Sequence, residues 1–226
     1  DSFGLDLSAI LSSVTEHQPG IIFLAYPNNP TGNLFSAAAI KQIISVAEGL
    51  VVIDEAYAPF ADATFMGELA QHDNLLVMRT ISKLGLAGLR LGYLVGAVNT
   101  IEQLNKVRLP YNINILTQAT ANFALTHHAI FDDQTRKIRA ERTVVYERLS
   151  EMNGIRPYPS SANFILFKTP KSKATDLFNA IKQQGVLIKN MNAHGGLLTD
   201  CLRVTIGKPD ENQAFLTALQ NSLNNL

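Results

Sequence analysis

Short apolar runs recur through the first hundred residues, and turn-forming or helical sequence separates them. We predict these runs to be strands at Ile21–Ala25, Leu50–Asp54, Leu75–Arg79 and Leu91–Gly96. Continuous apolar strands of this kind are typical of a mostly parallel sheet with helices on its faces. Between the first two runs, apolar residues recur at helical spacing over residues 36–48, with Ser36 as the N-cap. The pattern therefore predicts an α/β fold.

The second half of the chain predicts a different arrangement. Residues 117–153 have a helical pattern rich in charged side chains, and Gly154 and two prolines then interrupt the chain. In the series that follows we predict strands at Asn163–Lys168, Val186–Lys189 and Cys201–Ile206, and helices at Lys173–Gln184 and Asp210–Leu223. We predict a large sheet domain over residues 1–116. Interdomain helices and a smaller C-terminal α/β domain would occupy residues 117–226.

Composition excludes several classes of protein. The 226 residues are 46% hydrophobic and 17% charged, which indicates a compact globular protein. Lysine and arginine together number 19, and so do aspartate and glutamate, so the formal net charge is zero. The chain therefore lacks the basic field that attracts nucleic acid. The one cysteine, Cys201, cannot form an intrachain disulfide, which favours a reducing compartment. The apolar stretches are too short to span a membrane and no signal segment opens the chain, so we predict a soluble, cytoplasmic protein.

Three polar segments follow the predicted strands. They are Tyr26-Pro-Asn-Asn-Pro-Thr-Gly32, Val52-Ile-Asp-Glu-Ala-Tyr57, and Arg79-Thr-Ile-Ser-Lys83 with its continuation to Gly92. Ligands of open α/β sheets bind beyond the C-terminal ends of the parallel strands. We therefore expect these segments to converge on one pocket.

The polar side chains of the first two segments each have an ordinary interpretation beside a functional one. Asn29 lies in a sequence that forms turns, or its amide hydrogen-bonds a ligand oxygen. Asp54 caps a turn or helix, or its carboxylate keeps a buried nitrogen base protonated through opposite charge. Tyr57 is a half-buried aromatic residue, or its hydroxyl reaches the same ligand.

Lys83 is the least ordinary residue of the set. A lysine is usually solvated, but this one follows Thr80 and Ser82 in an otherwise uncharged stretch and precedes small and apolar residues. A partly desolvated lysine loses proton affinity and becomes an amine able to form an imine. Arg90 and the two hydroxyls either serve capping and solubility or clamp a phosphate.

Together these motifs resemble a known family. The set Asn-Pro-Thr-Gly, Asp-x-x-Tyr and Ser-Lys followed by Arg90 is similar to fold-type I pyridoxal 5′-phosphate (PLP)-dependent aminotransferases of the class I/II group. Within that group, Ser82–Tyr93, Lys106–Gln118 and Cys201–Asn212 resemble histidinol-phosphate aminotransferases, although a phosphate-substrate decarboxylase shares much of this pattern. The resemblance covers nearly the whole chain. It implies the fold of that family, PLP as the cofactor and transamination as the reaction.

The resemblance implies a role for each candidate residue around the cofactor. Lys83 would bind PLP through an imine and, once displaced, would move a proton between the substrate α-carbon and the cofactor. Asp54 would pair with the pyridinium nitrogen, and Asn29 and Tyr57 would hydrogen-bond the ring oxygen. The cofactor phosphate would be held by Thr80, Ser82 and Arg90.

The resemblance also implies a substrate site. Arg203 resembles the arginine that accepts the carboxylate of glutamate in one half-reaction and the phosphate of histidinol phosphate in the other. Lys189 stands where some members carry a second basic residue, or it is a solvated strand-end lysine. Asn163 would position the same anionic end or the interdomain loop. The implied substrates are histidinol phosphate or imidazole-acetol phosphate, glutamate and 2-oxoglutarate, in histidine biosynthesis.

Two features depart from the family. Arg90 follows Lys83 by seven residues, one fewer than in more distant relatives. The family's N-terminal portion, with a phosphate-binding turn, an aromatic residue that stacks on the cofactor and tyrosines offered across the dimer, has no counterpart, and the chain runs almost at once into a core strand. We therefore expect a fragment of a longer enzyme, which is a homodimer when complete. Whether the fragment is active by itself stays open.

Two other functions stay open on the sequence. One is a different PLP enzyme, either another aminotransferase or a decarboxylase of a phosphorylated amino acid. The other is a remnant of the cofactor domain without turnover, which would be recognised by whether PLP binds. The cluster of His127, His128, Asp132 and Asp133 indicates a solvated helix end, and we assign it no metal.

Overall fold

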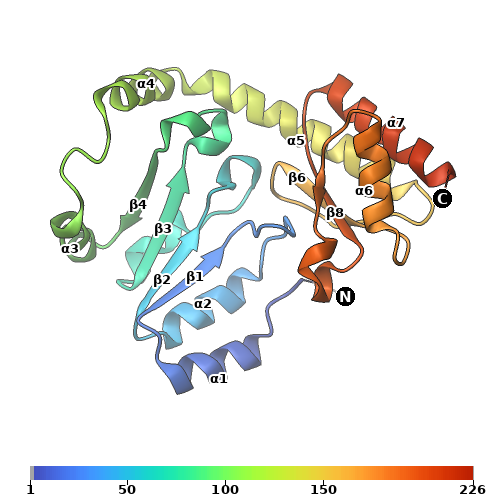
Figure 1. Cartoon of the computed structure of the whole chain (residues 1–226). Coiled ribbons are helices and arrows are strands. Elements are labelled where there is room, and N and C mark those ends of the chain that lie inside the picture. Colours follow the sequence, from blue (N-terminus) through green and yellow to red (C-terminus); the bar gives the residue numbers. More distant parts are fainter. Residues whose placement is uncertain (1–2, 226) are drawn as a thin grey trace. The chain divides into compact units, whose positions relative to one another are not determined.

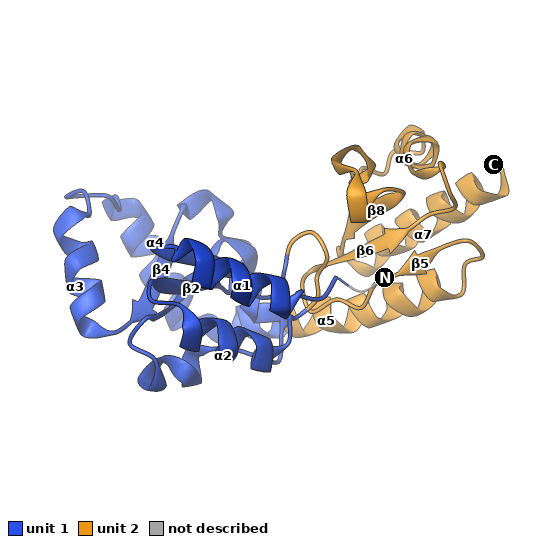
Figure 2. Cartoon of the chain, turned by 90° about the horizontal axis from the view of Figure 1, so that it is seen from below, with its two compact units in different colours: residues 1–28, 34–133 blue, residues 29–33, 134–226 orange. Residues whose placement is uncertain are grey.

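The computed structural model describes residues 3–225, and the chain separates into two compact units (Figure 2). Unit 1 comprises the chain up to residue 28 together with residues 34–133. Unit 2 comprises residues 29–33 and the chain from residue 134 onwards. The later boundary falls inside a long helix, whereas the sequence pattern changes at residue 117.

Unit 1 is built on a four-stranded sheet in the order β1-β2-β3-β4. The strands are β1 (Ile21–Ala25), β2 (Leu50–Asp54), β3 (Leu75–Thr80) and β4 (Gly92–Gly96). The first three run parallel, and β4 is antiparallel to β3. The prediction of a mostly parallel sheet is confirmed, with every strand within one residue of its predicted limits.

Helices α1 (Leu7–His17) and α2 (Ala37–Val46) cover one face of this sheet, which we call the closed face (Figure 1). Ser36 accepts a hydrogen bond from the N–H of Ala39 at 3.3 Å and so caps α2 as predicted. Apolar residues at helical spacing on the helices pack against alternate residues of the strands. The buried residues of this cluster include Val14, Ile40, Ile44, Val51, Ile53, Leu75 and Val77.

The opposite face of the sheet, which we call the open face, exposes large apolar side chains along β1. Along β1, Ile21 is 53% exposed and Phe23 is 64% exposed, while the alternate residues Ile22 and Leu24 pack against the closed-face core. The expectation that the chain runs almost at once into a core strand is therefore wrong. A helix, α1, precedes β1, and one side of that strand is exposed.

Short 3₁₀ turns and three further helices complete unit 1. The turns are η1 (Ala58–Phe60), η2 (Met66–Gln71), η3 (Ser82–Leu84) and η4 (Ala87–Leu89). The helices are α3 (Val98–Val107), α4 (Ile115–Thr126) and α5 (His128–Ser150), of which α5 continues into unit 2. Helices α4 and α5 match the helical pattern over residues 117–153. Within residues 3–225, no helix combines the length and apolar character needed to cross a membrane.

Unit 2 contains a second four-stranded sheet, in the order β5-β6-β8-β7, with each neighbouring pair antiparallel. The strands are β5 (Arg156–Pro157), β6 (Phe164–Lys168), β7 (Lys189–Asn190) and β8 (Cys201–Thr205). Helices α6 (Ala174–Gln183) and α7 (Pro209–Asn224) and the turns η5 (Asn192–His194) and η6 (Gly196–Leu198) complete the unit.

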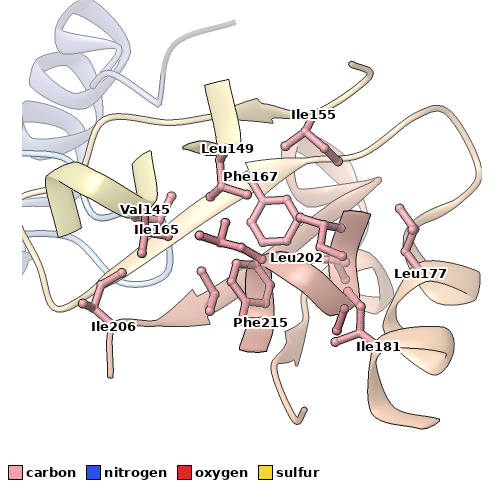
Figure 3. Packing of buried hydrophobic residues seen from close by; sticks show 14 of the residues in the cluster. Val145, Leu149, Ile155, Ile165, Phe167, Leu177, Ile181, Leu202, Ile206 and Phe215 are labelled. Carbon is pink, nitrogen blue, oxygen red and sulfur yellow. The ribbon is translucent and has the colours of Figure 1, made fainter. Parts of the chain in front are cut away.

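The core of unit 2 lies between this sheet and the helices around it (Figure 3). Phe167 of β6 and Phe215 of α7 pack with their ring centroids 6.0 Å apart. Leu149 of α5 and Leu177 of α6 join the same cluster and are fully buried. Because apolar residues of three helices meet both long strands, unit 2 has a core of its own.

One predicted strand of unit 2 is wrong. Residues 186–188 are not in a strand, and β7 covers Lys189–Asn190 alone. The reason is the end of α6, where Gly185 adopts a φ of +84° and the N–H of Val186 donates to the carbonyl of Ile181 at 3.3 Å. This glycine-ended helix cap takes up the residues that the apolar pattern assigned to the strand.

Candidate functional site

The candidate residues of unit 1 lie where β2 and β3 end. Asp54 is the last residue of β2 and Thr80 is the last residue of β3, and the two strands are parallel neighbours. Both residues line one pocket of about 470 Å³ on unit 1, together with Met78, Gly92 and Leu94. Two side chains that the sequence predicts to share a site are thus brought together.

Asp54 is held by the turn that follows it. Its Oδ1 accepts a hydrogen bond from the N–H of Ala56 at 2.9 Å, which fixes the side chain against its own backbone. The carboxylate is half-buried, and the backbone carbonyl of Asp54 accepts from the N–H of Tyr26 at 2.8 Å. The turn interpretation and the functional one are compatible, because the second carboxylate oxygen takes no part in this bond.

Thr80 and Ser82 form a small hydroxyl cluster at the start of the next loop. The hydroxyl of Thr80 donates to the Oγ of Ser82 at 2.8 Å or to the carbonyl of Leu91 at 2.9 Å. It also accepts from the N–H of Ser82 at 3.0 Å. Because both hydroxyls are half-buried and neighbouring, they can donate together to one anion.

Lys83 follows in the turn η3 and is half-buried. Its Nζ lies 5.0 Å from the centroid of the Tyr57 ring. An ammonium above an aromatic face is a favourable arrangement, and it brings the predicted lysine and tyrosine together. Neither residue lines the Asp54 pocket as the structure describes it over residues 3–225.

Arg90 lies apart from the pocket that Asp54 and Thr80 line. It is exposed, its φ is +50°, and its NH1 donates to the carbonyl of Ala87 at 3.4 Å. Among the described residues it lines neither the pocket of Asp54 nor the neighbouring pocket that Glu55 and Arg79 line. Its predicted part in a phosphate clamp stays a prediction.

Unit 2 joins Asn29 to Arg203. The NH1 of Arg203 donates to the Oδ1 of Asn29, and its guanidinium stacks 4.7 Å from the centroid of the buried ring of Phe164. The Nε of Arg203 is buried and lacks a hydrogen-bond partner among residues 3–225. Because the Nε is buried, an anion would be bound by the accessible donors of this half-buried guanidinium.

The loop that carries Asn29 is fixed by its glycine. Gly32 has a φ of +77°, and a β-carbon at this position would lie 2.4 Å from the Oγ of Ser160. Its carbonyl accepts from the N–H of Ser161 at 2.7 Å. The turn that the sequence predicts is present, and within unit 2 it presents Asn29 to Arg203.

Lys189 and Asn163 are the remaining predicted residues of unit 2. Lys189 is exposed on β7 and pairs in register with Arg203 of β8, so both side chains lie on one face of the sheet. Asn163 is half-buried, and its backbone carbonyl accepts from the N–H of Ile206 at 2.9 Å. The pairing places two cations side by side.

Glu55 and Arg79 form a buried ion pair that was not predicted from the sequence. Glu55 is 1% exposed and bonds Arg79 at the same strand ends that carry Asp54 and Thr80. The available signal was a second carboxylate directly after Asp54 and an arginine directly before Thr80, at the ends of two apolar runs.

Comparisons with known proteins place this chain in a family. It matches the family described as aminotransferase class I and II over residues 1–219. It is 56% identical over 220 residues to histidinol-phosphate aminotransferase 2 of Nitrosococcus oceani, which covers 97% of this chain and 61% of that protein. A second curated relative, from Cupriavidus pinatubonensis, is likewise covered over 61% of its length, so the chain spans about three fifths of these relatives.

Solved structures show the same fold. The histidinol-phosphate aminotransferase from Clostridium acetobutylicum is similar with a TM-score of 0.91 and 24% identity, over 100% of this chain and 70% of that one. The enzyme of that name from Sinorhizobium meliloti, solved in complex with pyridoxal-5′-phosphate, is similar with a TM-score of 0.83 and 26% identity, over 97% of this chain and 62% of that one. The predicted fold, that of fold-type I aminotransferases, is therefore confirmed. The chain belongs to the family of class I and II aminotransferases.

Proposed function

We propose that this chain is part of a PLP-dependent histidinol-phosphate aminotransferase. The observation that carries the proposal is the arrangement in unit 1, where Asp54 and Thr80 share a pocket and Lys83 lies over Tyr57. Class I and II aminotransferases act on many substrates, and the identity of 56% to a curated enzyme of that name favours histidinol phosphate among them.

The residues present fit the chemistry of PLP. The cofactor offers an aldehyde, a ring nitrogen, a phenolic oxygen and a phosphate, and unit 1 offers an amine, a carboxylate, a phenol and two hydroxyls for them. The pocket of about 470 Å³ is large enough for a small aromatic cofactor, and apolar walls formed by Met78 and Leu94 suit its ring. When bound, PLP supplies an electron sink for the α-carbon of an amino substrate.

Lys83 would act first as the covalent anchor and then as the proton carrier. Its Nζ lies 5.0 Å from the centroid of the Tyr57 ring, so the amine would stay close to the phenol that is proposed to contact the cofactor. Its free amine would then serve as the general base and acid that takes the proton from the substrate α-carbon and gives it back. The hydroxyl of Tyr57 would donate to the phenolic oxygen.

Asp54 would hold the positive charge of the ring nitrogen. A carboxylate beside a nitrogen base favours its protonated form. The bond from Ala56 N–H to Oδ1 leaves the other carboxylate oxygen for this contact. Thr80 and Ser82 would donate to the phosphate, and Arg90 would complete the clamp.

Unit 2 would bind the substrate anion. Arg203 offers a half-buried guanidinium, and Lys189 adds a second cation on the same face. Together they suit the carboxylate of glutamate or 2-oxoglutarate and the phosphate of histidinol phosphate or imidazole-acetol phosphate. Asn29, whose Oδ1 accepts from Arg203, retains its amide N–H groups for the phenolic oxygen of the cofactor. Asn163 would steady this end of the site.

We further propose that the complete enzyme is a homodimer in the cytoplasm. It would carry out aminotransfer between histidinol phosphate and 2-oxoglutarate in histidine biosynthesis. A decarboxylase of a phosphorylated amino acid would use the same cofactor residues, so the reaction products separate the two.

The test is an absorbance scan of the purified chain with PLP. We expect a visible band from covalently bound cofactor in the wild type and in Lys106→Ala, a control at an exposed lysine, and its loss in Lys83→Ala. An unchanged band in Lys83→Ala would refute the role of Lys83, and no band in the wild type would refute cofactor binding by this chain. Assays with histidinol phosphate and 2-oxoglutarate, with carbon dioxide release measured in parallel, then identify the reaction.

A further inference from the structure

Glu55 is a charged side chain that is completely withdrawn from solvent. Its side chain is 0% exposed, and both carboxylate oxygens accept hydrogen bonds. Oε1 accepts from the N–H of Phe65 at 2.6 Å, and Oε2 accepts from the Nε and NH2 of Arg79 at 2.9 and 2.7 Å. The hydroxyl of Thr64 lies 2.9 Å from both oxygens. A buried charge is tolerated when it is paired and bonded in this way.

The pair joins the ends of three strands. Glu55 directly follows β2, and its backbone N–H donates to the carbonyl of Met78 in β3 at 2.8 Å. Arg79 of β3 stands in register with Tyr93 of β4. Burial by itself lowers the pKa of Arg79, but the bonds to Glu55 and then to Tyr93 outweigh it, and the pKa is raised. Arg79 is therefore firmly charged between two partners on neighbouring strands.

Each member of the pair adjoins a candidate site residue. Glu55 follows Asp54, and Arg79 precedes Thr80. Successive residues of a strand alternate between its faces, so strand parity assigns Glu55 and Arg79 to the closed face and Asp54 and Thr80 to the open face. At the strand ends the two sets are neighbours, since Arg79 also lines the pocket of Asp54 and Thr80. Ile53 and Val77, which belong to the closed-face core, stand two residues before Glu55 and Arg79 and therefore share their parity.

We propose that Glu55 and Arg79 are positioning residues that fix, from the closed face, the separation of Asp54 and Thr80 on the open face. Catalytic groups must be held within about 0.5 Å of their working geometry by a rigid supporting layer. Two nitrogens of one guanidinium bond the same carboxylate oxygen, which sets the orientation of β3 against β2 more tightly than a single contact would. The role in the reaction rests on the proposed function.

Two backbone amides can report, without any cofactor, whether the side chains of Asp54 and Thr80 are held in place. The N–H of Ala56 donates to Asp54, and the N–H of Ser82 donates to Thr80. If the pair positions these side chains, its loss weakens both bonds, and both amides exchange hydrogen faster. Amide exchange followed by NMR resolves each of them.

The experiment compares Glu55→Gln with Ile44→Val, a closed-face core variant that lowers stability without touching the strand ends. We expect exchange at Ala56 and Ser82 to rise at least tenfold in Glu55→Gln relative to Ile44→Val, at urea concentrations that give equal fractions unfolded. Arg79→Lys keeps the charge but loses the forked contact, so it should fall between wild type and Glu55→Gln. It also carries the test if Glu55→Gln does not fold.

Equal exchange in Glu55→Gln and Ile44→Val would overturn the proposal, since the pair would then contribute stability alone. The same measurement with PLP added gives a second readout, and we expect PLP affinity about tenfold weaker in Glu55→Gln. A wild-type chain that binds no PLP would refute the proposed function, while the exchange rates would still decide the positioning role.

Discussion

On the closed face of the unit 1 sheet, Ile53 and Val77 are fully buried, whereas on the open face Ile21 and Phe23 are more than half exposed. The same strands supply both faces, since successive residues alternate between them. At the strand ends, the closed face carries the paired charges of Glu55 and Arg79, and the open face carries Asp54 and Thr80. The difference teaches that neighbouring residues of one strand can serve different ends, because the buried ion pair and the candidate site residues alternate along the chain at the ends of β2 and β3.

The largest effect expected from this division is on stability. Ile53→Ala removes a fully buried side chain from the closed face and should lower the free energy of unfolding by about 2–5 kcal/mol. Phe23→Ala removes a larger side chain from the open face and should change it by about 0.5 kcal/mol or less. Urea denaturation of both variants measures the two values, and similar losses would abolish the distinction between the faces.

A smaller loss of stability is expected from substitution of Asn74, whose side chain bonds the backbone at the end of α2 and between α2 and β2. Its side-chain amide donates to the carbonyls of Ile44 and Ala47 at 3.0 Å and of Gly49 at 3.3 Å. Asn74→Ala leaves these carbonyls without that donor and should cost about 1–3 kcal/mol. Asn105→Ala, at an exposed asparagine of α3, is the matched control and should stay within about 0.5 kcal/mol. Thermal or urea unfolding that gives the same change for both would contradict the role of Asn74.

The cap of α2 should contribute less again. Ser36→Ala removes the acceptor for the N–H of Ala39 and should lower the free energy of unfolding by about 1 kcal/mol, because α2 covers the closed face. Ser36→Asp supplies an equivalent acceptor and should retain wild-type stability. A loss of equal size in both variants would show that the hydroxyl is not what caps the helix.

Asp54→Asn should separate function from stability on the open face. The amide oxygen can still accept from Ala56 N–H, so the free energy of unfolding should change by about 0.5 kcal/mol or less. Loss of the negative charge should weaken PLP binding by about tenfold, because charge-assisted bonds contribute about 1.5–3 kcal/mol. A fluorescence titration with PLP checks the affinity, and an unchanged value would remove Asp54 from the site.

The smallest effect expected is a dependence on alkaline pH at Tyr26. Burial, and then the charge of Glu55, raise the pKa of this closed-face tyrosine above its usual 10.0. The folded state therefore binds the phenolic proton more tightly than the unfolded chain, so this contribution is complete below pH 10 and is lost as the pH rises through the folded-state pKa. Stability should fall more steeply above pH 10 in the wild type than in Tyr26→Phe. Parallel urea curves across that range would exclude the effect.

Much of the fold could be predicted because the signals were local. The four strands of unit 1 are apolar runs bounded by turn residues, and the cap at Ser36 lies three residues before its partner. Helices α1 and α3 are missing from the prediction, although Asp6 accepts from the N–H of Ala9 at 3.1 Å as a typical N-cap of α1. The short strand β7 was misplaced because the apolar pattern of residues 186–188 does not distinguish a strand from the end of a helix cap.

The sequence by itself determined which residues are candidates for the chemistry. The order of the motifs, the lysine in an uncharged stretch and the polar residues at strand ends are all properties of the linear chain, and they led to the prediction of Lys83, Asp54 and Tyr57 as site residues. The tertiary structure decided which of these groups meet. The bond between Asn29 and Arg203 spans 174 positions and that between Glu55 and Arg79 spans 24. Such contacts depend on strand register and sheet order, which local periodicity does not encode.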